Sequence, residues 1–360
     1  MTSRMRTRAR VATLLSAMAM AALIASEVAD EAQGDQQQAD ALYAEAELLL
    51  SSGRSEEAAA RLREAIASDP RHWRSHCALG QILAAASRLQ DAEASYETSV
   101  AIHPDPSCMA RLAQVLLVQE KLERAEDVLR RAAALDGAAE SVLYNLARLL
   151  DRSERFEEAV EVWERFIAVA ADPARLVAAR VRAARIYVLL GRPVDAIVPY
   201  RAALAADPGK NDVRAELASA LMQSSRLDEA WSEYEILIAA GTLDAAGLSN
   251  AGSLCQLRGD LPRAVELLSR SVAMDRSSIP TRIALAMAQA QSGQDAAAIA
   301  TLEAVVADNP EHVKAWFLMG QSLRKVGRLE EARKALQRHE QIHEKIMRER
   351  MAEPGGDTPR

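Results

Sequence analysis

The segment His339-Glu340-Gln341-Ile342-His343 is the strongest candidate for chemistry in this 360-residue chain. On a helix, His339 and His343 would lie one turn apart on the same face, as two zinc ligands do in hydrolases with an HExxH motif. A zinc hydrolase also needs a third ligand and a cleft for its substrate. Only 17 residues follow His343, and most are charged, Pro or Gly. We therefore expect a solvated helix surface, with a zinc hydrolase as a remote alternative.

A second group of metal-ligating residue types consists of His72, His76 and Cys77, at the start of a predicted helix. A solvated helix start is the simpler interpretation of these residues. The three cysteines cannot all pair with one another, and there is no CxxC motif. Cys77 and Cys108 fall near the starts of neighbouring predicted helices, so two interpretations stand: one disulfide in an oxidising compartment, or small thiols that are buried or half-buried.

The rest of the sequence offers no catalytic motif. There is no Gly-x-Ser-x-Gly segment and no Gly-rich phosphate-binding loop. We therefore predict that the chain is not an enzyme and has no catalytic residues, no metal and no cofactor. A hydrophobic content of 49% can form a large core, while 4% aromatic residues favour an all-helical chain. The formal net charge of -7 argues against nucleic acid as a partner.

The N-terminal segment predicts export from the cytoplasm. Four arginines within residues 4–10 precede the apolar run 11–25, and an acidic, Gln-rich stretch follows. This is the pattern of a secretory signal in a bacterial protein. We assign residues 1–26 to a signal peptide or N-terminal anchor and residues 27–38 to a polar linker. The chain would then lie in the periplasm or cell envelope, touching a membrane only through an uncleaved N-terminal segment.

The remaining chain contains an internal repeat. Nine alanines follow one another at spacings of 33 to 37 residues, most of them 34: Ala58, Ala92, Ala125, Ala159, Ala196, Ala230, Ala264, Ala298 and Ala332. We call these the marker alanines. The residue twelve positions before each is always Ala or Gly, and the residue four positions after each is large and apolar or aromatic. These paired small sites predict two helices per repeat that touch closely.

A short turn is predicted between the two helices of each repeat. Five positions before the marker alanine, six repeats carry Gly53, Gly191, Gly259, Gly293, Gly327 or, less typically, Ser225. Glycine at this place ends a helix in a left-handed cap. Pro70, Pro104, Pro208 and Pro310 close four repeats, where proline halts one helix and can open the next.

This pattern resembles the tetratricopeptide repeat. The best match is in the last repeat, at Trp316, Met319, Gly320, Leu323, Ala332 and Leu336, and Tyr144 to Ala147 in the fourth repeat also look like it. The resemblance covers residues 39–346. It implies an all-α fold, a right-handed α-solenoid of about nine helix-turn-helix repeats. In such a solenoid the first helices line a concave groove and the second helices face outward.

The repeats are expected to begin near residues 39, 73, 106, 140, 177, 211, 245, 279 and 313, with a helix extension and disordered tail over residues 347–360. The fourth repeat is three residues longer than the others, at residues 169–173. This insertion predicts a loosened turn or an altered curvature.

If the resemblance holds, the groove is rich in arginine from the second to the fifth repeat. The candidate ligand-binding residues are Arg111, Tyr144, Asn145, Arg148, Arg152, Arg182 and Arg185. Guanidinium groups bind carboxylates through two parallel hydrogen bonds, so the arginines predict an acidic partner. Pairing with acids on neighbouring helices is the alternative. Asn145 and Arg182 are also similar to part of the carboxylate clamp of chaperone-binding repeats, although Ala110, Gln114 and Ala178 replace its other residues.

The sequence therefore favours two hypotheses for the function. The first is a non-catalytic scaffold or adaptor that binds a protein or peptide partner in the groove, in cell-envelope assembly or secretion. The alternative is a structural or oligomerising accessory protein with no ligand in the groove.

Overall fold

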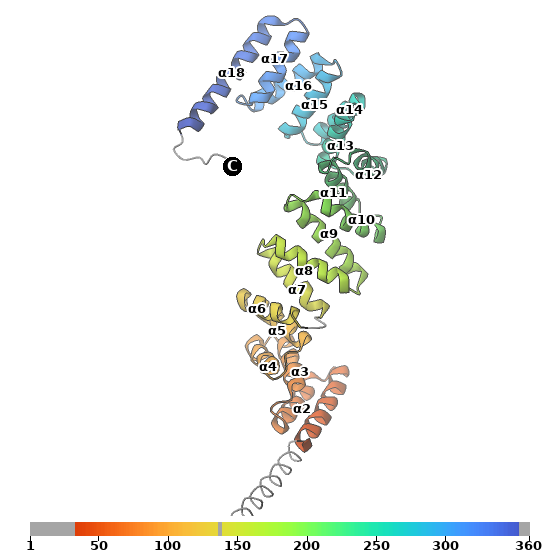
Figure 1. Ribbon diagram of the computed structural model, residues 1–360, viewed down its shortest axis with the longest axis vertical. Coiled ribbons are helices and arrows are strands. Elements are labelled where there is room, and N and C mark those ends of the chain that lie inside the picture. The colour runs from red at the N-terminus through yellow and green to blue at the C-terminus, as the bar shows by residue number, and fades with distance from the viewer. Residues whose placement is uncertain (1–32, 136–138, 353–360) are drawn as a thin grey trace, which may run out of the picture. The chain divides into compact units, whose positions relative to one another are not determined.

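The computed structural model describes residues 33–135 and 139–352, and the regular structure of these residues is entirely helical (Figure 1). Residues 33–51 are helical. The helices that follow are α2 (Ser55–Ser68), α3 (Trp73–Ala85), α4 (Leu89–Ile102), α5 (Pro106–Val118), α6 (Leu122–Ala133), α7 (Glu140–Arg152), α8 (Phe156–Val169), α9 (Pro173–Leu189), α10 (Pro193–Ala206), α11 (Asn211–Gln223), α12 (Leu227–Ala240), α13 (Ala245–Leu257), α14 (Leu261–Met274), α15 (Ile279–Gln291), α16 (Asp295–Asp308), α17 (Val313–Lys325) and α18 (Leu329–Ala352). Consecutive helices form nine pairs, which confirms the predicted helical repeat fold.

The described residues divide into two compact blocks, one up to residue 171 and one from residue 172, here called the N-terminal and C-terminal blocks. Within each block, the first helix of one repeat contacts the first helix of the next, as α3 does with α5 and α15 with α17. Each second helix also packs against the following first helix, as α4 does against α5. First helices and second helices therefore form two separate layers within a block.

The marker alanines lie where the two helices of a pair are closest. Eight of the nine have no exposed surface, and Ala332 is 4% exposed. The small residues twelve positions earlier are buried in all nine repeats. The large residues four positions later fill the adjoining space, and Tyr96, Tyr200 and Tyr234 are among the largest fully buried side chains. The paired small sites therefore set the approach of the helices, as the sequence predicted.

The turn inside each repeat has the same geometry in all nine repeats, not only in the six with a predicted cap. A left-handed backbone occurs at five glycines and at Ser87, Glu120, Glu154 and Ser225. In every turn the next amide donates to a carbonyl five residues earlier, as Arg88 N does to Leu83 O at 2.9 Å. This closing hydrogen bond is the signature of a Schellman cap. The shared hydrogen bond holds the turn even where no glycine is present.

The longer fourth repeat lengthens the helix that follows it. The helix α8 ends at Val169, and α9 begins after three residues and runs for 17 residues, whereas α7 and α11 have 13. The expected start of the fifth repeat near residue 177 is therefore corrected to Pro173. Pro173 occupies the first helical position, and Asp172 caps the helix by accepting a hydrogen bond from the Ala174 amide at 3.0 Å. The insertion thus extends α9 by one turn.

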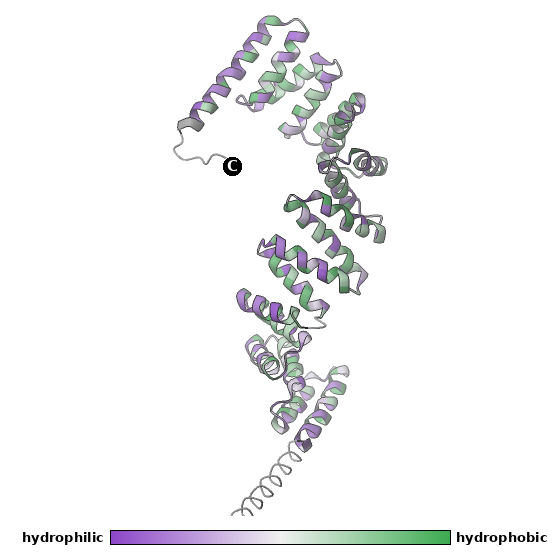
Figure 2. Cartoon of the chain, viewed as in Figure 1, coloured by the Kyte–Doolittle hydropathy of each residue, from purple (hydrophilic) through white to green (hydrophobic). Residues whose placement is uncertain are grey.

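The two ends of the chain differ from expectation in one respect. The sequence predicts a linker at residues 33–38, but these residues are helical. Gln is a good helix former, and Ser68 Oγ donates to the Asp35 carbonyl at 3.2 Å. The proposed signal segment, residues 1–26, and the tail beyond residue 352 lie outside the described residues. The last helix, α18, has 24 residues and is mostly hydrophilic (Figure 2). No helix among the described residues is long and apolar enough to cross a membrane.

Candidate binding surface

Four exposed arginines lie on first helices of the N-terminal block. Arg74 belongs to α3, Arg111 to α5, and Arg148 and Arg152 to α7. We call these four residues the first-helix arginines. The predicted groove residues Tyr144 and Asn145 are half-buried on α7 between them. The structure therefore places five of the seven predicted ligand-binding residues on two neighbouring first helices of one block.

The first-helix arginines have no carboxylate partner among the described residues. In the part of the chain that the structure describes, none of the four makes an ion pair. Arg148 lies over the ring of Tyr144, 5.5 Å from its centroid, and Arg74 lies over Trp73 at 5.3 Å. A cation–π contact uses the face of the guanidinium and leaves its N–H groups, which point outward from its edge, for other acceptors.

Tyr144 is held by an aromatic cluster formed between α7 and α8. Its ring centroid lies 5.6 Å from that of Trp163 and 5.4 Å from that of Phe166. Trp163 and Phe166 are buried and meet edge to face at 5.8 Å. The cluster fixes the position of the Tyr144 ring, which in turn positions the guanidinium of Arg148.

The basic residues on the second helices of the same block behave differently, because carboxylates surround them. Glu93 on α4 accepts from Lys121 Nζ and Arg124 Nη1, both at 2.6 Å. On the next repeat, Arg155 pairs with Glu126 and Glu158, each at 2.6 Å. Burial raises the pKa of Glu93, but the hydrogen bonds from Lys121 and Arg124 outweigh it and hold the pKa below its usual range. Most arginines of this layer are thus paired within the protein. Among the described residues, Arg63 of α2 makes no ion pair, and Arg165 of α8 donates to the Ala133 carbonyl at 2.6 Å.

Charge is therefore divided between the two layers of the second, third and fourth repeats. The first helices α3, α5 and α7 carry four arginines against two acids, Glu140 and Asp151. The second helices α4, α6 and α8 carry ten acids against four arginines. In these three repeats a net basic layer lies on a net acidic one, so α3, α5 and α7 attract anions although the whole chain is acidic. The first helix of the first repeat, within residues 33–51, carries four acids and no basic residue, and the basic surface does not extend onto it.

The two remaining predicted residues, Arg182 and Arg185, lie in the C-terminal block on α9. Arg185 donates through Nε and Nη2 to the two oxygens of Glu216 on α11, at 2.8 and 2.7 Å. The Tyr200 hydroxyl donates to the same carboxylate at 2.8 Å. Arg185 is therefore held in an internal ion pair, which is the alternative that the sequence left open for these arginines.

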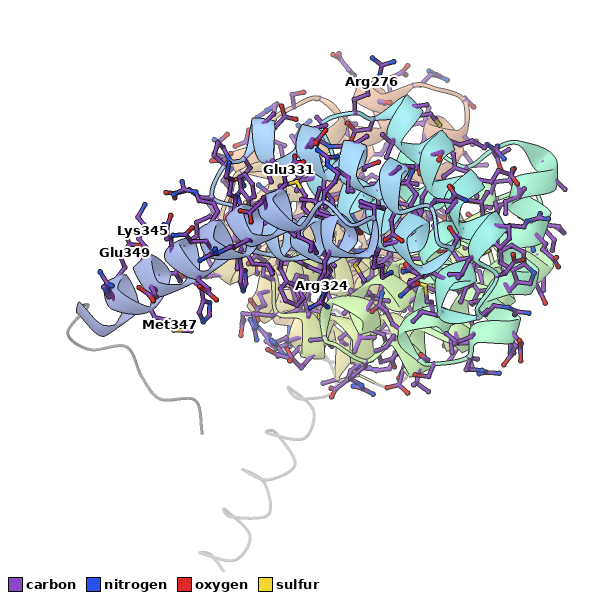
Figure 3. All side chains as sticks on the ribbon, turned by 90° about the horizontal axis from the view of Figure 1, so that it is seen from above. Arg276, Arg324, Glu331, Lys345, Met347 and Glu349 are labelled. Atoms are coloured by element: carbon purple, nitrogen blue, oxygen red, sulfur yellow. The ribbon has the colours of Figure 1, made fainter. Side chains whose placement is uncertain are left out.

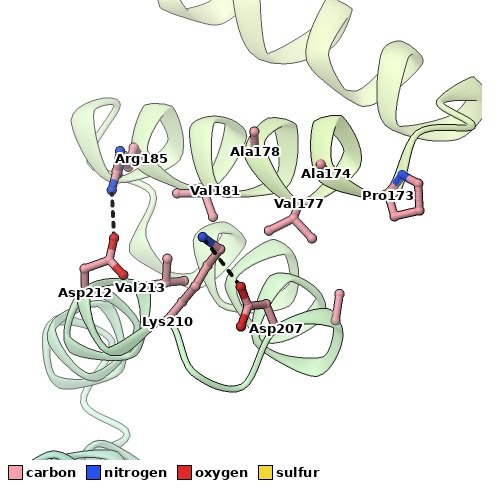
Figure 4. Close-up of a pocket in the computed structure, with 11 residues that line it drawn as sticks. Pro173, Ala174, Val177, Ala178, Val181, Arg185, Asp207, Lys210, Asp212 and Val213 are labelled. Atoms are coloured by element: carbon pink, nitrogen blue, oxygen red, sulfur yellow. Dashed lines mark ion pairs between the residues drawn. The ribbon is translucent and has the colours of Figure 1, made fainter.

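A cavity of about 560 Å³ adjoins this ion pair (Figure 4). Its floor is apolar, with Val177 and Val181 of α9 and Val213 of α11. Lys210 and Asp207 form an ion pair at 3.7 Å across its rim. The added turn of α9 supplies Pro173 and Ala174 to the wall. Sequence reasoning missed this cavity, although the insertion at residues 169–173 marks its place.

The HExxH segment lies on α18 and shows no metal site. His339 Nδ1 lies 3.1 Å from the Val313 carbonyl oxygen, and its ring packs on Phe317 with a centroid distance of 5.3 Å. His343 and Glu340 are exposed. Within residues 33–135 and 139–352, no group of three or more His, Cys, Asp or Glu side chains could hold a metal ion.

His72 and His76 also make contacts within the protein. His72 is buried, with Ser75 Oγ at 2.7 Å from Nδ1 and Asp40 Oδ1 at 3.1 Å from Nε2. His76 Nε2 lies 3.0 Å from the Pro70 carbonyl oxygen. Cys77 and Cys108 are free thiols, Cys77 half-buried and Cys108 buried. The structure thus shows two thiols here rather than a disulfide.

Comparison with known proteins identifies the repeat. A family model described as the tetratricopeptide repeat matches residues 43–107, 144–211, 216–279 and 283–345. Solved structures with similar folds include MamA (20% identity, 45% of this chain and 95% of that chain, TM-score 0.43). A second is YrrB, described as a repeat protein with an unusual peptide-binding site (19% identity, 47% and 87%, TM-score 0.44). A third is a tetratricopeptide repeat protein from Parabacteroides merdae ATCC 43184 (15% identity, 70% and 99%, TM-score 0.41). No curated protein matches the sequence.

Proposed function

Because the chain belongs to the tetratricopeptide repeat family, a fold that serves in general as a scaffold for protein–protein interaction, we propose that it is a non-catalytic scaffold with a partner-binding surface on its first helices. The partner is a protein or peptide. The surface consists of the four first-helix arginines together with Tyr144 and Asn145. The fold alone does not select this surface, since many unrelated functions share one scaffold.

The observation that carries the proposal is the contrast between the two layers of the N-terminal block. On the second helices α4, α6 and α8, Arg124, Arg130 and Arg131 have carboxylate partners within the protein, and Arg165 donates to a backbone carbonyl. Arg148 and Arg152 have none among the described residues. An arginine without an internal partner can bind an external carboxylate without breaking an ion pair of the protein. A paired arginine must first leave its internal carboxylate.

The partner is accordingly acidic. Two arginines on α7 and one on each of α3 and α5 can bind carboxylates that are spread along a polypeptide. Each guanidinium can donate two parallel hydrogen bonds to one carboxylate, which favours carboxylates over single halide ions. The acidic second helices α4, α6 and α8 repel the same partner and restrict it to the first-helix side of these three repeats. The net charge of -7 disfavours nucleic acid.

We further propose that the chain acts outside the cytoplasm, in envelope assembly or secretion. This rests on the basic and apolar N-terminal segment of the sequence. The scaffold would reach a membrane only through that segment if it is not cleaved.

Affinity capture with the double variant Arg148→Glu/Arg152→Glu tests the binding surface. The matched control is Arg131→Glu, which reverses an exposed charge on the second helix α6 of the same block, where Arg131 pairs with Asp127 at 3.5 Å. Quantitative mass spectrometry should show that the double variant loses acidic partners which the wild type and Arg131→Glu retain. An identical partner set for all three proteins would exclude the first-helix surface.

A further inference from the structure

Within a block, neighbouring repeats cover one another. One position of the first helix shows this clearly. The first-helix residue ten positions before the marker alanine is 5% exposed or less from the third repeat onward: Val115, Leu149, Ile186, Ala220, Leu254, Ala288 and Ser322. The equivalent residue of the first repeat, Leu48, is 70% exposed. Within a block, interior repeats bury this face against the repeat before them, and Leu48 marks its exposed counterpart.

The last repeat shows the complementary face. Three positions before the marker alanine, Leu89, Phe156, Leu227 and Leu261 are half-buried and Leu122 is 38% exposed, whereas Leu329 is 63% exposed. The large residue four positions after the marker alanine is buried in the first eight repeats, but Leu336 is only half-buried. Leu329 and Leu336 lie on the surface of α18 where a following first helix would pack.

Both faces are hollowed to a similar extent. A cavity of about 490 Å³ lies at Leu48, Leu49 and Ala60 of the first repeat. A cavity of about 500 Å³ lies at Leu329, Ala332 and Leu336 of the last. We call these the front face and the rear face. Each has the apolar centre and polar rim that are typical of protein interfaces.

The charges around the two cavities have opposite signs. Three glutamates and two arginines line the front face: Glu45, Glu57, Glu64, Arg54 and Arg61. Arg324, Arg333 and Glu340 line the rear face, and none of these three makes an ion pair among the described residues. The front face therefore has an excess of one negative charge and the rear face an excess of one positive charge.

We propose that the front face of one copy of this chain docks on the rear face of a second copy. The contact repeats between molecules what α16 and α17 do within one, where a second helix receives the next first helix. A second copy supplies the first helix that no following repeat provides at the rear face, and it brings a face of opposite net charge. A second copy therefore fits better than an unrelated partner. Front and rear are different surfaces, so the contact is heterologous and leaves a free face at each end of the assembly. Copies therefore add head to tail.

The position of α18 is compatible with this docking. Lys345 of α18 pairs with Glu311, next to the start of α17, at 2.7 Å. The last turns of α18, with Met347 and Glu349, extend beyond this pair and away from the neighbouring helices (Figure 3). The rear cavity lies at the other end of α18, around Leu329, so these turns do not cover it.

Sedimentation equilibrium of the full chain and of two charge variants tests the proposal. Leu48→Glu spoils only the front face, and Leu329→Glu spoils only the rear face. Wild type should show an average mass that rises with concentration beyond a dimer. Each variant alone should be a monomer. An equimolar mixture of the two variants should form a dimer and stop there, because one intact front face meets one intact rear face.

The matched control is Leu257→Glu, which changes an equally exposed leucine (67%) at the end of α13 that lines neither cavity. It should associate like wild type, and circular dichroism should show all variants folded. Three results would overturn the proposal: a wild type that stays monomeric, variants that associate like wild type through some other segment, or a mixture that remains monomeric. The assembly and the arginine surface involve different residues, so failure of one leaves the other standing.

Discussion

Gly80 lies so close to Tyr96 that a Cβ added to the glycine would stand 2.9 Å from two carbons of the tyrosine ring. Gly252 and Leu268 have the same relationship in the seventh repeat, as do Gly320 and Leu336 in the ninth, both at 2.7 Å. These pairs join the small site of a first helix to the large residue of its second helix. The absence of a methyl group therefore sets how closely the two helices approach.

Substitution of Gly80 by Ala should destabilise the chain, since overpacking costs about 1–3 kcal/mol and exceeds the gain of about 1 kcal/mol in helix propensity. In a Tyr96→Ala background the ring is gone, so the same substitution should become stabilising. Urea denaturation followed by circular dichroism measures both effects. Stabilisation in both backgrounds would show that the ring does not limit the approach of the helices.

The left-handed turns predict a stabilising substitution. Glu154 has a φ of 57° and is exposed. Glu154→Gly should raise the free energy of unfolding by about 0.5–1 kcal/mol, because relief of the left-handed penalty exceeds the added flexibility of the unfolded chain. Gly259→Ala, at a φ of 84° with open space around it, should have the opposite effect. Equal stabilities of these two variants and wild type would refute the strain argument.

The carboxylate of Glu93 predicts a dependence of stability on pH. Its pKa is depressed in the folded chain, so its stabilising effect is complete above the unfolded pKa of about 4.3 and is lost as pH falls through the folded pKa. Glu93→Gln should cost about 1–2 kcal/mol at neutral pH, less than a fully buried pair because Lys121 and Arg124 are partly exposed. Urea denaturation at pH 7 and pH 3 should show this difference shrinking in acid. A difference independent of pH would mean that packing, not charge, explains the loss.

The HExxH segment should prove structural. His339→Ala should lower stability by about 1 kcal/mol, because it removes the contacts to the Val313 carbonyl and to Phe317. His343→Ala should have little effect, since His343 is exposed. Thermal denaturation with and without added zinc should give the same midpoint for the wild type. A stoichiometric zinc shift that needs both histidines would reopen the zinc hydrolase interpretation.

Much of the fold could be predicted because small residues recur in the sequence with the period of the repeat. Ala and Gly at two fixed sites per repeat report close helix contact directly, so the helix pairs were predictable. The turns at Ser87, Glu120 and Glu154 were missed, because the backbone hydrogen bonds that hold them leave no trace in residue type. The added turn of α9 was also missed, because an insertion of three residues fits a loop or a helix equally well.

The candidate surface was only partly predictable. The spacing placed arginines on first helices, but it could not tell a paired arginine from an unpaired one. Arg185 and Arg148 look alike in the sequence, yet Glu216 on α11 holds the first and no carboxylate among the described residues holds the second. That difference depends on side chains about 30 residues apart that only the fold brings together.

The most direct test of the central claim is the binding of an acidic peptide to the first-helix arginines. Fluorescence anisotropy with a labelled polyglutamate peptide should show binding that weakens as salt is added, because screening reduces the attraction between exposed charges. The Arg148→Glu/Arg152→Glu variant should bind at least about tenfold more weakly, a loss of about 1.4 kcal/mol, while Arg131→Glu binds like wild type. Equal affinity of all three proteins, or no binding by the wild type, would contradict the account.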